Sequence, residues 1–223
     1  MDIHTTLRHR APAWYGPYAA DVGTVVGFDL DMTLVDSHTA ITSSLDHVCR
    51  SHAVERGHEE LAAKIGLPLD DVLVSLVPGI DPVVGARIYR EYYERTALGS
   101  TTILAGAHSA LALVSGTGGT TVVVTAKRED QARMVLAHVG LSADRVVGGA
   151  FGHEKGDALR EVGAHAYVGD HPGDMVGASR AEALAIGVLT GGHTSDQLLA
   201  AGADIILSTL EAFEPWYSEW QRG

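Results

Sequence analysis

The spacing of apolar residues along the chain changes near residues 38 and 98. Between these points the apolar side chains recur at helical intervals, as Ile41, Leu45 and Val48 do, and no convincing strand is visible. Asp81-Pro82 has the cap and first-turn proline that commonly open a helix. The pattern predicts helices over 38–52, 58–65, 69–76 and 81–97.

Outside this helical block, short β-branched runs alternate with helical segments. The expected strands cover 24–29, 120–125, 145–147, 166–168, 185–189 and 204–207. The expected helices cover 107–114, 129–139, 156–162, 174–183 and a segment near 208–214. Thr194 and Gln197 form a capping-box pattern that predicts one more helix start. Such alternation predicts a parallel sheet with helices on both faces.

The fold class predicted from this order is α/β, with a Rossmann-like parallel sheet and an inserted α-helical cap domain. We expect the α/β core to comprise residues 24–37 and 99–223, and the cap to comprise residues 38–98. Residues 1–23 read as an irregular N-terminal arm. Three aromatic residues near the C-terminus indicate either a tail that docks on the core or an interface patch, and we favour the docked tail. They are Trp216, Tyr217 and Trp220.

The composition narrows the possible partners. The chain of 223 residues has a formal net charge of −12, which disfavours binding to the nucleic-acid phosphate backbone. It has no apolar run long enough to span a membrane, so no membrane partner is expected. A single cysteine, Cys49, cannot form an internal disulfide, and this favours a reducing cytoplasm. Both a monomer and a homodimer remain open.

Polar residues gather where the predicted strands end or the following helices begin. In a parallel sheet these positions share one edge, which is where ligands bind in open α/β folds. Carboxylate oxygens suit Mg²⁺ together with a substrate phosphate, and a lysine and a hydroxyl can hold phosphate oxygens. The residues at this edge are Asp29, Asp31, Thr125, Lys155, Asp170 and Asp174.

These residues occur in the order of the four motifs of the haloacid dehalogenase superfamily, which the chain resembles over roughly residues 24–213. The cap directly after the first motif, and the tail Ala185 to Gly191, resemble the phosphoglycolate-phosphatase-like branch. The matching motifs are Asp29-Leu30-Asp31-Met32-Thr33, Thr125, Lys155 and Gly169-Asp170-x-x-x-Asp174. Four motifs in order are far more specific than any one of them.

The resemblance implies a role for each matching residue. Asp29 would attack phosphorus and form an aspartyl-phosphate, and Asp31 would protonate the leaving oxygen and later activate water. Thr125 and Lys155 would bind the phosphoryl group. The implied Mg²⁺ ligands are the Asp29 carboxylate, the Asp31 backbone carbonyl, Asp170 and Asp174.

Two positions depart from the family pattern. Met32 stands where members commonly have glycine, and a larger side chain there could crowd the cap side of the site. Lys155 is followed by Gly156-Asp157 instead of the proline typical of this branch, so its loop could differ. Neither change removes a catalytic group.

In the cap, the loop that contains Lys64, Gly66 and Leu67 resembles the substrate-facing loop of phosphoglycolate-type phosphatases. Lys64 also resembles the Schiff-base lysine of phosphonatases, but those enzymes carry a small residue where this chain has Asp31. Asp31 favours hydrolysis of a phosphate ester, because a leaving oxygen needs a proton. Three other cap residues read as a solvated helix face. They are Arg87, Arg90 and Arg95.

The expected activity is that of a Mg²⁺-dependent phosphatase that hydrolyses a small phosphorylated metabolite, of which a phosphoglycolate-like ester is one example. A phosphomutase and a phosphonatase of the same superfamily remain alternatives. A catalytically idle binding protein is a third alternative, which the complete set of motif residues argues against.

Overall fold

The computed structural model describes residues 23–222, so all but the last residue of the N-terminal arm lies outside it. Its main feature is a six-stranded parallel sheet in the order β5-β4-β1-β6-β7-β8. In that order the strands are Arg145–Val147, Thr120–Val124, Val25–Phe28, Ala166–Gly169, Leu184–Val188 and Ile205–Leu207. The expected α/β fold is confirmed.

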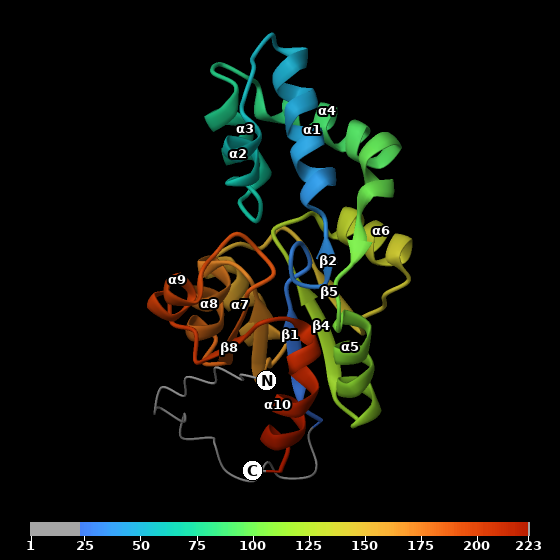
Figure 1. Ribbon diagram of the computed structural model, residues 1–223, viewed down its shortest axis with the longest axis vertical. Coiled ribbons are helices and arrows are strands. Elements are labelled where there is room, and N and C mark those ends of the chain that lie inside the picture. The colour runs from blue at the N-terminus through green and yellow to red at the C-terminus, as the bar shows by residue number, and fades with distance from the viewer. Residues whose placement is uncertain (1–22, 223) are drawn as a thin grey trace.

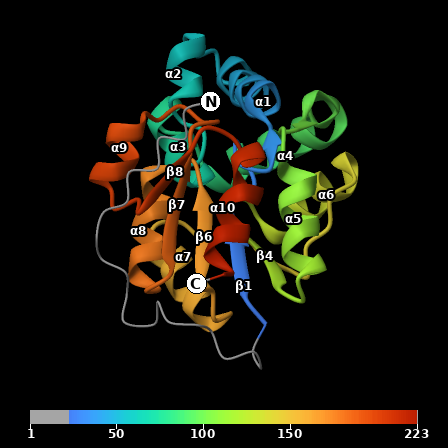
Figure 2. The ribbon, with the colours of Figure 1, turned by 60° about the horizontal axis from the view of Figure 1, so that its bottom comes forward.

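Helices cover both faces of this sheet (Figures 1 and 2). Successive strand residues point to opposite faces, so Val123 packs in one buried cluster while Val122 and Val124 pack in the other. One face is covered by α5 (Ala107–Gly116), α6 (Glu129–Val139) and α10 (Phe213–Trp220). The other is covered by α7 (His153–Glu161), α8 (Pro172–Arg180) and α9 (Ser195–Ala200).

Local sequence signals explain where several helices start and end. Thr194 and Gln197 form the predicted capping box at the start of α9. Helix α6 ends at Gly140, which adopts a left-handed conformation with φ of 73°. The predicted starts of α7 and α8 were too late, because α7 begins at His153 and α8 at Pro172. A proline is favoured in the first turn of a helix.

The segment of residues 38–100 is mostly helical and lies above the sheet (Figure 1). Its elements are α1 (His38–Ser51), α2 (His58–Ala62), α3 (Leu69–Leu76), α4 (Pro82–Tyr92), the π-helix η1 (Tyr93–Ala97) and the 3₁₀-helix η2 (Leu98–Ser100). Apolar side chains of α1, α3 and α4 pack together inside it, among them Leu45, Leu73 and Tyr89.

Two short strands connect this helical segment, the cap, to the core. Strand β2 (Val35–Asp36) pairs antiparallel with β3 (Thr102–Ile103), with Val35 opposite Ile103. The hydrophobic pattern did not predict either strand, because two residues are too few to show an alternation. The pairing fixes the two chain crossings side by side at the base of the cap.

At the C-terminus, a further 3₁₀-helix, η3 (Leu210–Ala212), leads into α10. Tyr217 is fully buried, and its hydroxyl lies 3.1 Å from that of Thr117. Trp216 and Trp220 are partly buried against the core, so the predicted docking of this tail is confirmed. In the described range 23–222, no helix has both the length and the apolar character needed to cross a membrane.

Candidate active site

Three buried carboxylates converge at the edge where the strands end. One oxygen from each of Asp29, Asp170 and Asp174 lies within 4.8 Å of the others. Strand pairing brings them together, since β1 and β6 are neighbours and the Asp29 amide donates to the Val168 carbonyl at 2.8 Å. Residues that are about 140 positions apart in sequence thereby form one cluster, as the strand-end argument predicted.

Lys155 lies in the middle of this cluster. Its ammonium is 2.8 Å from Asp29 Oδ1 and 2.5 Å from Asp174 Oδ1. The sequence pattern placed Lys155 just before a helix, but it lies inside the first turn of α7. The lysine side chain is 3% exposed, so both ion pairs are shielded from water.

The cluster carries more negative charge than Lys155 can balance. Burial raises the pKa of Asp29 to about 7 although Lys155 acts in the opposite direction, and Asp174 raises it further. Burial, followed by the charges of Asp174 and Asp29, raises the pKa of Asp170 as well. Three hard oxygen donors and one lysine leave a deficit of positive charge that a divalent cation such as Mg²⁺ would fill.

Neighbouring loops hold these carboxylates in place. The Thr33 hydroxyl donates to Asp170 Oδ1 at 3.1 Å, and the Thr190 hydroxyl donates to the Met32 carbonyl at 2.6 Å. Gly191 packs so closely that a Cβ atom there would lie 1.8 Å from Asp170 Oδ2. Only glycine therefore fits at this position without displacing the Asp170 carboxylate.

Asp31 has different surroundings from Asp29, although only Leu30 separates them. Its Oδ2 lies 3.3 Å from the Lys127 ammonium, and its Oδ1 is buried without a hydrogen-bond partner among the described residues. The Asp31 carboxylate is not part of the three-carboxylate cluster. The binding of Mg²⁺ by its backbone carbonyl remains a prediction.

Thr125 follows β4 on the other side of β1. The register pairs Phe28 with Val123, which places Thr125 beside the segment that begins at Asp29. The Thr125 hydroxyl is buried and accepts a hydrogen bond of 3.2 Å from the Lys127 amide. The position suits the predicted phosphate contact, which remains a prediction.

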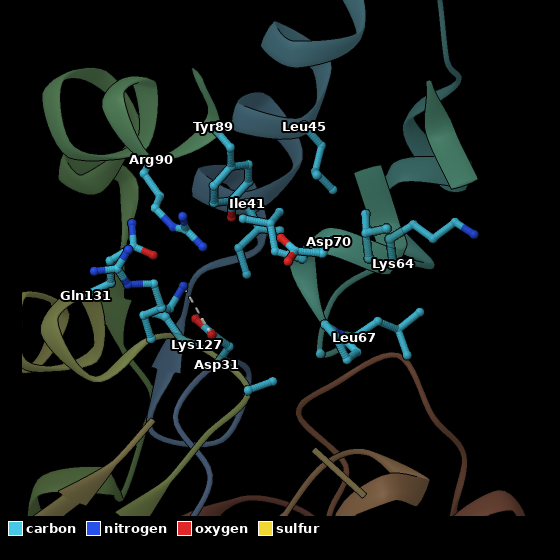
Figure 3. A pocket seen from close by; sticks show the side chains of 16 residues that line it. Asp31, Ile41, Leu45, Lys64, Leu67, Asp70, Tyr89, Arg90, Lys127 and Gln131 are labelled. Carbon is cyan, nitrogen blue, oxygen red and sulfur yellow. Dashed lines mark ion pairs between the residues drawn. The ribbon is translucent and has the colours of Figure 1, made fainter. Parts of the chain in front are cut away.

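A pocket of about 210 Å³ lies between Asp31 and the cap (Figure 3). The cap loop containing Lys64, Gly66 and Leu67 forms part of its wall, as the resemblance implied. Gly66 has a φ of 87°, and a Cβ there would lie 3.3 Å from the His171 ring of the core. The cap loop thus approaches the core directly at the pocket.

Sequence reasoning missed three polar residues of this pocket. Arg90 was expected on a solvated face, but it is partly buried and lines the pocket with Lys127 and Gln131. Sequence signals could have revealed two of them, Lys127 and Arg90. Lys127 is one of only three lysines. Arg90 follows Ala86 and precedes Tyr93 at the helical spacing of a buried face.

A comparison with protein families identifies the motif-bearing part of the chain. Residues 26–188 match the model of the haloacid dehalogenase-like hydrolases. Among curated proteins, "Probable phosphatase IndB" of Dickeya dadantii is 33% identical over 205 residues, which cover 83% of this chain and 89% of that protein.

Solved structures share the same fold. A predicted phosphatase from Clostridium acetobutylicum superposes with a TM-score of 0.78 at 23% identity, over 89% of this chain and 99% of that one. A predicted phosphoglycolate phosphatase from Haemophilus somnus superposes with a TM-score of 0.75 at 18% identity, over 87% and 98%. The chain therefore belongs to the haloacid dehalogenase-like hydrolases, and within that family it is a hydrolase of phosphoric monoesters.

Proposed function

We propose that the protein is a Mg²⁺-dependent phosphatase that hydrolyses a small phosphorylated metabolite through a phosphorylated Asp29. The observation that carries this proposal is the contrast between Asp29 and Asp31. Asp29 lies with Lys155 among carboxylates, whereas Asp31 pairs with Lys127 and lines the pocket. Two neighbouring carboxylates in different environments are suited to two different chemical roles.

In the proposed first step, an Asp29 carboxylate oxygen attacks phosphorus and the bond from phosphorus to the leaving oxygen breaks. Asp31 gives its proton to that oxygen, and an alcohol leaves. In the second step Asp31 removes a proton from water, the water oxygen attacks phosphorus, and the bond to Asp29 breaks. The products are the alcohol and inorganic phosphate, and both aspartates return to their starting state.

The other cluster residues would serve the phosphoryl group and the metal. Asp29, Asp170 and Asp174 would hold Mg²⁺, which when bound offsets the charge of the phosphoryl oxygens. Lys155 and Thr125 would hold the same oxygens by hydrogen bonds. To do so, Lys155 would give up its ion pair with either Asp29 or Asp174. A bound cation would then neutralise the carboxylate that Lys155 leaves.

The cap would control access of water. The cap loop at Gly66 lies close to the core, since a Cβ there would be 3.3 Å from the His171 ring, and Gly66 lines the same pocket as Asp31. A closed cap that excludes bulk water favours transfer of the phosphoryl group to Asp29. The pocket volume of about 210 Å³ favours a small leaving group, since pockets for drug-sized ligands are roughly 300–1,000 Å³.

The test of the proposed function is to trap the phosphorylated enzyme. A substrate with a good leaving group, p-nitrophenyl phosphate, needs little protonation, so Asp31→Asn should still complete the first step while the water step fails. Intact-protein mass spectrometry in the presence of Mg²⁺ should show the gain of one phosphoryl group, and peptide mapping should place it on Asp29. Asp29→Asn and the double variant should gain none.

A label on Asp31, a serine or a histidine would contradict the proposed roles. Product analysis separates the phosphatase from the phosphomutase alternative, which would return an isomerised phosphate ester in place of inorganic phosphate. The phosphonatase alternative predicts that borohydride traps Lys64 covalently on phosphonoacetaldehyde. In our proposal Lys64→Ala changes substrate affinity but does not abolish the hydrolysis of simple esters.

A further inference from the structure

The polar wall of the pocket contains two buried donor atoms that have no hydrogen-bond partner among residues 23–222. They are Nε of Arg90 and Nε2 of Gln131. Gln131 is 5% exposed, and within residues 23–222 Arg90 forms no ion pair. A buried donor normally finds an acceptor, so two unused donors in one pocket indicate that a bound molecule supplies the acceptors.

The two donors come from different parts of the molecule. Arg90 lies on cap helix α4, and Gln131 lies on core helix α6. Figure 3 shows their side chains on the same side of the pocket, next to Lys127 and above Asp31. A group bound by both would therefore connect the cap to the core at the site of the reaction.

The charge of the pocket contrasts with that of the whole chain. Four cationic side chains and two carboxylates line it, although the chain carries a net charge of −12. Lys127 and Arg128 are paired with Asp31 and Asp130, and these pairs leave Arg90 as the unpaired cation beside Gln131. The ammonium of the remaining lysine, Lys64, extends away from this wall in Figure 3.

We infer that Arg90 and Gln131 determine specificity by binding an oxyanion on the leaving group, so that the substrate is a small phosphate ester with a second anionic group. This inference rests on the proposed function. A planar guanidinium with a neighbouring amide N–H₂ matches the oxygen pair of a carboxylate or the oxygens of a second phosphate. The apolar part of the pocket lining, which includes Ile41 and Leu45, would contact the short carbon skeleton.

Three two-carbon esters test the inference, because they differ only in the second group. Phosphoglycolate carries a carboxylate, ethylene glycol bisphosphate carries a phosphate, and 2-hydroxyethyl phosphate carries a neutral hydroxyl. The wild type with Mg²⁺ should have a higher kcat/KM for at least one anionic ester than for the neutral one, and the larger of the two anionic values identifies the oxyanion.

Arg90→Gln should lower kcat/KM for the preferred anionic ester by roughly 10- to 100-fold, because it removes a charge-assisted hydrogen bond. It should change the value for 2-hydroxyethyl phosphate by less than about threefold, since that ester never made the bond. Gln131→Glu should lower kcat/KM for the anionic ester by a similar factor, because the new carboxylate repels the anionic group. The matched controls Arg87→Gln on α4 and Arg133→Gln on α6 remove exposed, ion-paired arginines and should change neither value.

Hydrolysis of phenyl phosphate separates the two possible failures. If the wild type hydrolyses phenyl phosphate but shows no preference for an anionic ester, the inference is wrong and the proposed function stands. The inference is also wrong if Arg90→Gln affects anionic and neutral esters alike, or if Lys64→Ala alone removes the preference. If the wild type releases phosphate from none of these esters, the proposed function fails and the inference fails with it.

Discussion

The ammonium of Lys127 lies 3.3 Å from Oδ2 of Asp31, and the two side chains are only 7% and 10% exposed. The same ammonium lies 4.6 Å from the centre of the Tyr93 ring, which belongs to the cap. Burial lowers the pKa of Lys127, but the charge of Asp31, the nearby Tyr93 and Tyr89 and the hydrogen bond to Asp31 together raise it above its usual value, so the lysine stays charged. Lys127 thus connects the proposed acid and base to the position of the cap.

Replacing Lys127 with methionine should slow turnover by roughly 10- to 100-fold, because Asp31 loses the group that orients it for proton transfer. The loss should be largest for substrates with a poor leaving group and smallest for p-nitrophenyl phosphate. Steady-state kinetics over a series of leaving groups measures this difference. Lys127→Arg, which keeps the charge, should recover part of the activity. An equal loss for all leaving groups would contradict the proposed role.

Removal of divalent metal should abolish hydrolysis, and Mg²⁺ should restore it. Binding should also stabilise the fold, since a ligand at 100 times its dissociation constant adds about 2.7 kcal/mol to the free energy of unfolding. For a chain of this size that corresponds to a rise in Tm of roughly 5–10 °C. Differential scanning fluorimetry with and without Mg²⁺ measures the shift.

The Tm shift should be much smaller in Asp170→Asn, which removes one ligand of the proposed metal site. The control Asp46→Asn changes a partly exposed carboxylate outside the cluster that pairs with Arg50, and it should keep the full shift. Undiminished turnover in metal-free protein would overturn the proposed dependence on Mg²⁺.

Met32 adopts a left-handed conformation with φ of 61°, a conformation that favours glycine. For a non-glycine residue this conformation costs roughly 1–2 kcal/mol, which is partly offset because glycine loses more entropy on folding. Met32→Gly should therefore leave the free energy of unfolding unchanged or raise it by up to about 1 kcal/mol. Met32→Val should lower it by about 1–2 kcal/mol, since β-branched residues fit this region poorly.

Urea denaturation of the three proteins measures these differences. A marked loss of stability in Met32→Gly would show that the methionine side chain contributes packing that outweighs its backbone strain. Met32 is not among the residues that line the pocket, so the expected crowding of the cap side is not observed there.

Asp144 precedes β5 and binds the start of the adjacent strand β4. Its contribution to the free energy of unfolding should depend on pH. Its Oδ2 accepts hydrogen bonds from the amide and the hydroxyl of Thr121 at 2.7 and 2.8 Å, and these bonds lower the pKa of Asp144. The ionised form is therefore the stabilising one. Its contribution is complete above the unfolded-state pKa of about 3.9 and is lost as the pH falls through the lower folded-state pKa.

Asp144→Ala should lower the free energy of unfolding by about 1 kcal/mol at pH 7, since hydrogen bonds to charged groups are weakened by solvent at an exposed site. The difference should vanish near pH 2. Asp204 is an internal comparison, because burial raises its pKa and its Oδ2 accepts from the Ala185 amide at 2.9 Å. Asp204→Asn should not destabilise at pH 7, because the buried charge is removed while an acceptor remains. Chemical denaturation at both pH values tests the pair.

The sequence alone determined which residues are candidates for the chemistry and in what order the strands follow one another along the chain. Alternating β-branched runs and helical segments define a parallel sheet, and parallel strands bring their ends to one edge. For that reason the sequence pattern places Asp29, Lys155, Asp170 and Asp174 in one cluster. Capping signals such as the Thr194 and Gln197 pair involve only a few neighbouring residues, so the start of a helix can be predicted from them directly.

Only the tertiary structure decided which side chains face each other across the cap and the core. Arg90, Lys127 and Gln131 share one pocket because cap helix α4 and the start of core helix α6 both contribute to its wall, and no local pattern records that packing. The two residues of β3 become a strand only because Val35 and Asp36 lie beside them. Periodicity shows which face of an element is buried, whereas the partner on that face depends on contacts between segments that are distant in sequence.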